Sequence, residues 1–135
     1  MANLTITSVE PADSRTRAIT AVAGEAIAVG DLIYLDSADS KMKLADASAV
    51  ATSGVVGISL TAAAADGDFI VYVASQTIDL GAILTAGTIY CVSATAGKIC
   101  PHADLVSTNV VAILGYATST SQMILNVVDT GVVIA

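Results

Sequence analysis

Two cysteines and a single histidine lie close together in the second half of this sequence and are the residues best suited to chemistry. Cys91 and Cys100 flank a turn, residues 94–97, that would place them opposite each other on paired strands. Three outcomes are open: two thiols that pack as small apolar side chains, which we favour, a disulfide, or a zinc site. Zinc would need two further ligands, and only His102 lies nearby. Since His102 follows Pro101 with no partner that can be named, we expect a solvent-exposed loop residue and no catalytic site.

Acidic residues gather in the expected turns, and two groups of them resemble ion ligands. Asp36 and Asp39 share one turn, and Asp66 and Asp68 share another. Carboxylate oxygens at this spacing can bind calcium, but the distal glutamate of a calcium loop is missing. We interpret these aspartates as turn residues that accept hydrogen bonds from their own backbone. The sequence therefore predicts no metal site.

Lys43 lies in a predicted hairpin, where biotinyl and lipoyl carrier domains carry their modified lysine. Its neighbours are Met42 and Leu44, whereas the carrier motif has methionine on both sides or an aspartate before the lysine. The glycines of the first half open no helix and precede no Gly-Lys-Ser/Thr, so they do not form a phosphate-binding loop. With no catalytic or cofactor-binding residue assigned, we predict that the protein is not an enzyme and needs no cofactor.

The elements that carry these residues are repeated, in two similar units of roughly 55 residues. The matched residues are Gly24 with Gly81, Gly30 with Gly87, Ile33-Tyr34 with Ile89-Tyr90, and Lys43-Leu44 with Lys98-Ile99. In this alignment Cys91 and Cys100 match Leu35 and Leu44, which favours the apolar role for both thiols. Because the repeated residues are small and apolar, the repeat indicates a scaffold.

Short runs of aliphatic and β-branched residues between turn residues predict strands in both units. The runs are 18–22, 32–35, 41–44, 55–60, 69–73, 77–80, 83–84, 89–92, 98–100, 110–114 and 123–128. This spacing predicts an all-β fold, a small barrel or sandwich built from two similar β-rich repeats. Residues 1–16 are predicted as an extended N-terminal arm. Residues 17–135 are predicted as a single β domain, with repeats over about 18–74 and 75–129 and an apolar tail, 130–135.

Charge is scarce and mostly negative, at 13% charged residues and a formal net charge of −7. Nucleic-acid binding needs a basic face, so it is excluded. Leu105–Val128 carries no charge, but its many polar residues rule out a membrane span. The first residues lack the pattern of a secretory signal, and we expect the protein in the cytoplasm or in a particle assembled there. A surface with so little charge is best buried against other chains.

Several residues together carry a resemblance to a known family. They are Gly24, the run Gly30-Asp31-Leu32-Ile33-Tyr34, Lys43 followed by Ala45, and Val56-Gly57-Ile58. With this pattern the sequence resembles the capsid decoration, or cement, proteins of tailed bacteriophages. The resemblance implies a β-rich protein on the outside of the virion head, commonly a homotrimer, that binds the major capsid protein and bridges neighbouring capsid subunits.

Two segments outside the repeated frame are expected to contact partners. Arg15 and Arg17 in the arm suit an acidic partner, and Val132, Val133 and Ile134 form an apolar tail that needs a strand to pair with. Two alternatives stay open. A tail-tube, tail-fibre or head-fibre component would have the same composition. A glycan-binding β module is disfavoured, because the sequence has no Trp and one Phe to stack against sugars.

Overall fold

The computed structural model describes residues 3–4, 6, 9–11, 18–74 and 76–134, and its regular structure is almost entirely antiparallel β strand. The strands are β1 (Glu10–Pro11), β2 (Ala18–Val22), β3 (Leu32–Asp36), β4 (Lys41–Leu44), β5 (Val55–Ser59), β6 (Phe69–Val73), β7 (Gln76–Asp79), β8 (Ile89–Val92), β9 (Ile99–Pro101), β10 (Val110–Ala117) and β11 (Gln122–Val133). Two short 3-10 turns, η1 (Val50–Thr52) and η2 (His102–Asp104), are the helical elements of these residues. No described helix is long and apolar enough to cross a membrane. The predicted all-β class is confirmed.

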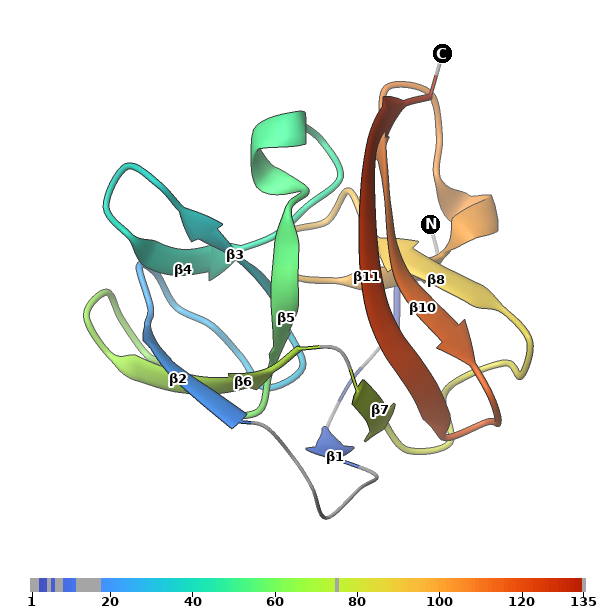
Figure 1. Cartoon of the computed structure of the whole chain (residues 1–135), viewed down its shortest axis with the longest axis horizontal. Helices are drawn as coiled ribbons and strands as arrows, with labels where there is room; N and C mark the ends of the chain where they lie inside the picture. Colours follow the sequence, from blue (N-terminus) through green and yellow to red (C-terminus); the bar gives the residue numbers. More distant parts are fainter. Residues whose placement is uncertain (1–2, 5, 7–8, 12–17, 75, 135) are drawn as a thin grey trace.

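The strands form two sheets that pack against each other (Figure 1). The first sheet has the order β2-β6-β5-β3-β4, and the second has the order β1-β7-β11-β10-β8-β9. Adding five to each strand number of the first sheet reproduces the last five strands of the second, in the same order. The two similar repeats predicted from the sequence are therefore two copies of one sheet topology, with β1 added at one edge.

Backbone hydrogen bonds at the start of β3 and β8 show which residues of the two copies correspond. The bonds are Gly30 N to Ser59 O (2.8 Å) and Ser59 N to Asp31 O (2.9 Å) in the first copy, and Gly87 N to Ala117 O (2.8 Å) and Ala117 N to Thr88 O (3.0 Å) in the second. Counting onward from the two glycines, Leu32 corresponds to Ile89. The sequence alignment, which paired Ile33 with Ile89, is one residue out of register, and such a shift places a side chain on the opposite face.

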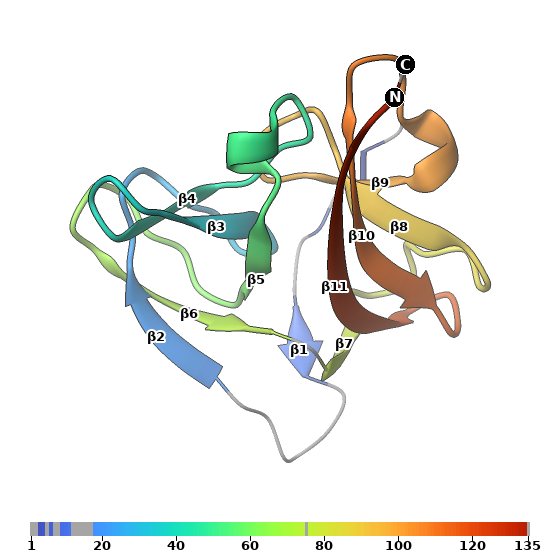
Figure 2. The same cartoon turned by 45° about the horizontal axis from the view of Figure 1, so that its top comes forward.

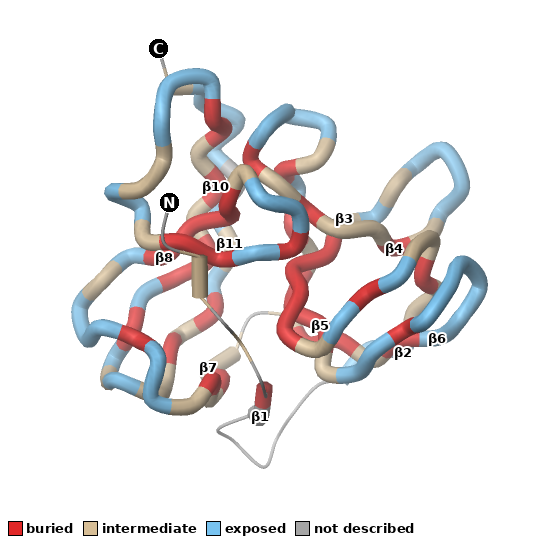
Figure 3. Tube along the Cα trace, turned by 180° about the vertical axis from the view of Figure 1, so that it is seen from behind, coloured by how far each residue is buried: buried red, intermediate tan, exposed pale blue. Residues whose placement is uncertain are grey.

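The main core lies between the two sheets. It is filled by aliphatic side chains of both, including Leu32, Ile58 and Val73 from the first sheet and Leu114 and Leu125 from the second, each at most 1% exposed. Burying a side chain of this size stabilises the fold by about 1.5–3 kcal/mol. The views in Figures 1 and 2 both show β5 beside β11 at this junction, and Figure 3 shows buried segments gathered where the sheets face each other.

A smaller core lies within the first sheet, which curls on itself. Ile27, Ile33, Met42, Ile70 and Tyr72 fill this interior and are at most 8% exposed. At one end of the curl Ala23 forms a bridge with Met42, so the two edges of the sheet meet there. The sheet does not close along its length, which makes the fold a sandwich rather than a closed barrel.

Candidate partner-binding surfaces

Every lysine of the chain forms an ion pair with an aspartate. Lys41 Nζ lies 2.8 Å from Asp66 Oδ1, and Lys43 Nζ lies 2.8 Å from Asp36 Oδ2 and 3.2 Å from Asp39 Oδ2. In the second copy's hairpin, Lys98 Nζ lies 3.5 Å from Oδ1 of Asp31, a residue of the first copy. Hydrogen bonding to lysine lowers the pKa of Asp36 and of Asp66. Each lysine therefore already has an aspartate partner within the chain.

The turn aspartates accept hydrogen bonds from backbone amides in their own turns, as the sequence predicted. The Asp36 carboxylate accepts from Ala38 N at 2.9 Å, and the Asp39 carboxylate accepts from Lys41 N at 3.1 Å. Asp68 accepts from the amides of the loop before β6. Within the described residues no three His, Cys, Asp or Glu side chains gather as a metal site would require.

The two cysteines lie directly opposite each other on β8 and β9, as the sequence predicted, and both are free thiols. Both side chains are fully buried, and this burial raises the pKa of Cys91 and of Cys100 to about 11. By the register of the two copies they correspond to Tyr34 and Lys43 rather than to Leu35 and Leu44. The apolar packing role holds, although the alignment that favoured it was shifted. His102 lies exposed in η2.

The described part of the N-terminal arm packs on the body of the protein. Leu4 N donates to Ile99 O at 2.9 Å, and the Asn3 side chain donates to Thr95 Oγ1 and accepts from Ser93 Oγ. β1 then pairs with β7 at the edge of the second sheet. Arg15 and Arg17 lie outside the described residues, so their role as partner contacts stays a prediction.

The apolar tail continues β11 and pairs with β10 of its own chain. Val132 lies opposite Val111, and Val133 lies opposite Val110. Ile134 N donates to Asn109 O at 2.9 Å, which secures the end of the strand. The side chains of Val132 and Val133 are 59% and 49% exposed, and Ile134 is partly exposed. The tail is thus held by its backbone and presents valines to solvent.

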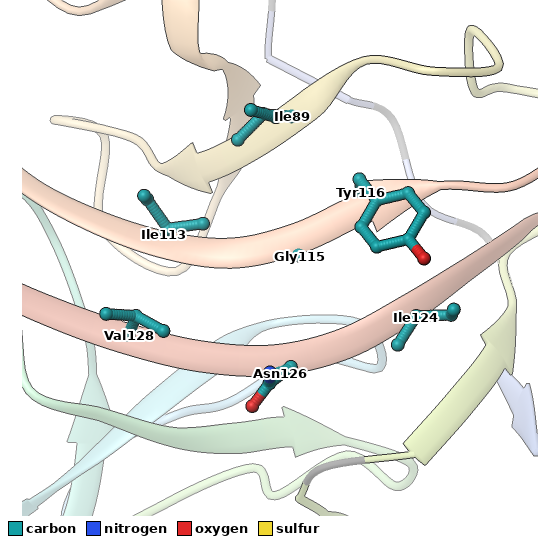
Figure 4. A pocket seen from close by; sticks show the side chains of 7 residues that line it. All are labelled: Ile89, Ile113, Gly115, Tyr116, Ile124, Asn126 and Val128. Carbon is teal, nitrogen blue, oxygen red and sulfur yellow. The ribbon is translucent and has the colours of Figure 1, made fainter.

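A shallow groove on the outer face of the second sheet was not predicted from the sequence. Seven residues of β8, β10 and β11 line it: Ile89, Ile113, Gly115, Tyr116, Ile124, Asn126 and Val128 (Figure 4). Its volume is about 210 Å³, and no charged side chain lines it. A Cβ at Gly115 would clash with the carbonyl oxygen of Ile124, so the position requires glycine and leaves a gap between the side chains on β10.

One sequence signal could have located this groove. Residues 105–128 carry no charge, and the strand 110–114 within them is apolar at every position. A strand that is apolar on both faces, in a sheet covered by a partner layer on one face, exposes an apolar surface. The missing charge of this segment is a property of the outer sheet face and not of a membrane-spanning helix.

The two β layers have packed interiors, and the groove on the outer face of the second sheet is lined by no charged side chain. A family model described as phage cement protein matches residues 10–75, which run from β1 to the end of β6. This segment, just under half of the chain, is similar to the phage cement proteins, and the resemblance inferred from the sequence is confirmed. The family indicates a capsid-associated structural role rather than an enzymatic one. No curated protein matches the chain.

Proposed function

We propose that the protein binds the outer surface of a phage capsid and stabilises the head by bridging neighbouring capsid subunits. The match of β1 through β6 to the phage cement proteins carries this proposal. The low charge and the exposed valines of β11 support it, because surfaces of this kind are stable when a partner covers them. The partner is the major capsid protein, and the binding unit is a homotrimer that engages several subunits at once, so that avidity multiplies weak contacts.

The arm and the tail supply the contacts to the capsid. Arg15 and Arg17 are the two basic residues of the chain besides the three lysines, which are paired with aspartates. They recognise acidic groups on the capsid surface. Val132, Val133 and Ile134 add an uncharged strand end that packs against an apolar part of the capsid protein.

Capsids that lack the protein test this proposal directly. Added protein should co-sediment with such capsids, raise the temperature at which they release DNA, and be visible by cryo-electron microscopy as an ordered outer layer. The Arg15→Gln, Arg17→Gln double variant should bind several-fold more weakly and with less dependence on salt, because exposed charges act through screened electrostatics. Lys41→Gln, Lys98→Gln is the matched control, since it removes the same charge from lysines that are already paired.

Three results would overturn the proposal. The first is protein that stays in the supernatant with empty and filled capsids alike. The second is an ordered position inside the tail instead of on the head, which would favour the tail component considered from the sequence. The third is equal loss of binding in the arginine and lysine variants, which would remove the arm from the contact.

A further inference from the structure

Equivalent side chains of the two copies have opposite surroundings. In the first copy Leu32, Ile58 and Val73 pair across three neighbouring strands, and all three are fully buried. We call these three residues the covered row. It belongs to the main core, so the layer that covers it is the second sheet of the same chain.

The corresponding row in the second copy is open. Ile89, Tyr116 and Ile124 pair across β8, β10 and β11 in the same way. We call them the open row. Ile89 is 41% exposed and Tyr116 is 48% exposed, and Ile124 is partly exposed. All three residues of the open row line the groove of about 210 Å³, with Tyr116 and Ile124 at one end of it (Figure 4).

Charge indicates what can cover the open row. Each copy of the chain carries a net charge of −7, so negatively charged residues within a contact between two copies would add to the repulsion between them. The groove adds no such repulsion, because its seven lining residues include no charge. In the first copy, in addition, the equivalent face of the sheet packs against the second sheet, which has the same strand order. A second copy of this chain is thus the occupant that both observations favour.

The chain also offers a side chain of suitable size for the groove. Phe69, at the start of β6, is 70% exposed, more than any other large apolar residue described. β6 belongs to the first sheet, away from β8, β10 and β11 (Figures 1 and 2). An apolar cavity of about 150 Å³ is large enough to bind benzene, so a groove of about 210 Å³ can hold the phenyl ring of Phe69.

We propose that the groove on the second sheet of one chain receives Phe69 from the first sheet of another copy. The contact is head to tail, because the two surfaces lie on different sheets of each chain. Head-to-tail contacts that close form rings, and the proposed homotrimer is such a ring. The inference rests on the self-association within the proposed function and does not depend on binding to the capsid.

Sedimentation velocity of the free protein over a range of concentrations tests the contact. Phe69→Ala should weaken self-association about tenfold or more, as truncation of a central interface aromatic does. Asn126→Asp and Asn126→Lys should both weaken it, because either charge would be buried without a partner in the groove. Leu35→Ala is the matched control: Leu35 is 51% exposed on the first sheet and should leave association unchanged.

Mixing the variants separates this contact from a symmetric one. Phe69→Ala keeps the groove and Asn126→Asp keeps the phenyl ring, so an equal mixture should form dimers that neither variant forms alone. Three outcomes would overturn the proposal: a wild-type chain that is monomeric throughout, Phe69→Ala that associates like wild type, or a mixture that stays monomeric. Circular dichroism of each variant confirms that the fold is kept. Because no capsid is present, loss of capsid binding would count against the proposed function and not against this contact.

Discussion

The two copies within this chain have the same strand order and opposite exposures. The covered row of the first copy, Leu32, Ile58 and Val73, lies in the main core, whereas the open row of the second copy, Ile89, Tyr116 and Ile124, faces outward. The same topology thus serves as a core layer in one half and as a surface in the other. The difference shows that the sheet topology does not decide which face is buried. The neighbouring layer decides it.

The copies also differ in what occupies one cross-strand pair. Tyr34 lies opposite Lys43 in the first copy, where the lysine reaches the aspartates of its own turn. Cys91 lies opposite Cys100 at the same place in the second copy, and both are buried. The first copy therefore has a charged hairpin at this place, whereas the second has a buried pair of thiols.

The largest expected effect compares a residue of each row. Ile58→Ala should lower the free energy of unfolding by about 2–5 kcal/mol, because it leaves a cavity in the main core. Tyr116→Ala should change the monomer's stability by about 0.5 kcal/mol or less, since its ring is half exposed. Urea denaturation at a concentration where the protein is monomeric measures both. Equal losses in the two variants would mean that the rows are buried alike.

The strands and the repeat were accessible from the sequence because their signals are local. Short alternating runs and turn aspartates located β3 and β4 to within a residue. β11 was harder: the run ended at Val128, but the strand continues to Val133 because β10 pairs with it. That pairing is a long-range contact, which a local pattern does not contain.

The candidate surface could be predicted only in part for the same reason. The exposed valines of the tail were found from their lack of charge. The groove was missed because Ile89, Tyr116 and Ile124 have the sequence pattern of core residues. The sequence does not show that this face of the second sheet lacks a covering layer. The one-residue shift in the repeat alignment had a similar origin: a gap placed after Gly87 matched identical letters, while the hydrogen-bond ladder continues without it.

A smaller effect concerns the buried cysteine pair of the second copy at high pH. The pKa of each thiol is raised from 9.0 to about 11 in the folded protein. Between these values the unfolded chain releases protons that the folded chain keeps, so stability should fall as pH rises from 9 to 11. Burial also raises the pKa of Tyr34, which acts in the same direction. Denaturation at pH 8 and pH 10 should show the loss, and Cys91→Ala, Cys100→Ala should reduce it; an unchanged slope would contradict the assignment to the thiols.

The smallest effect belongs to the charged hairpin of the first copy at low pH. The pKa values of Asp36 and Asp66 are lowered below their ordinary 3.8 by hydrogen bonds from Lys43 and Lys41. Their stabilisation is complete above that value and is lost as the pH falls through the lowered pKa values. The pairs are partly exposed, so the loss should be slight and should shrink further in high salt. Lys43→Met should remove the Asp36 part of this acid dependence, as measured by thermal unfolding between pH 5 and pH 2. A loss that persists in Lys43→Met and in high salt would place the acid sensitivity outside this hairpin.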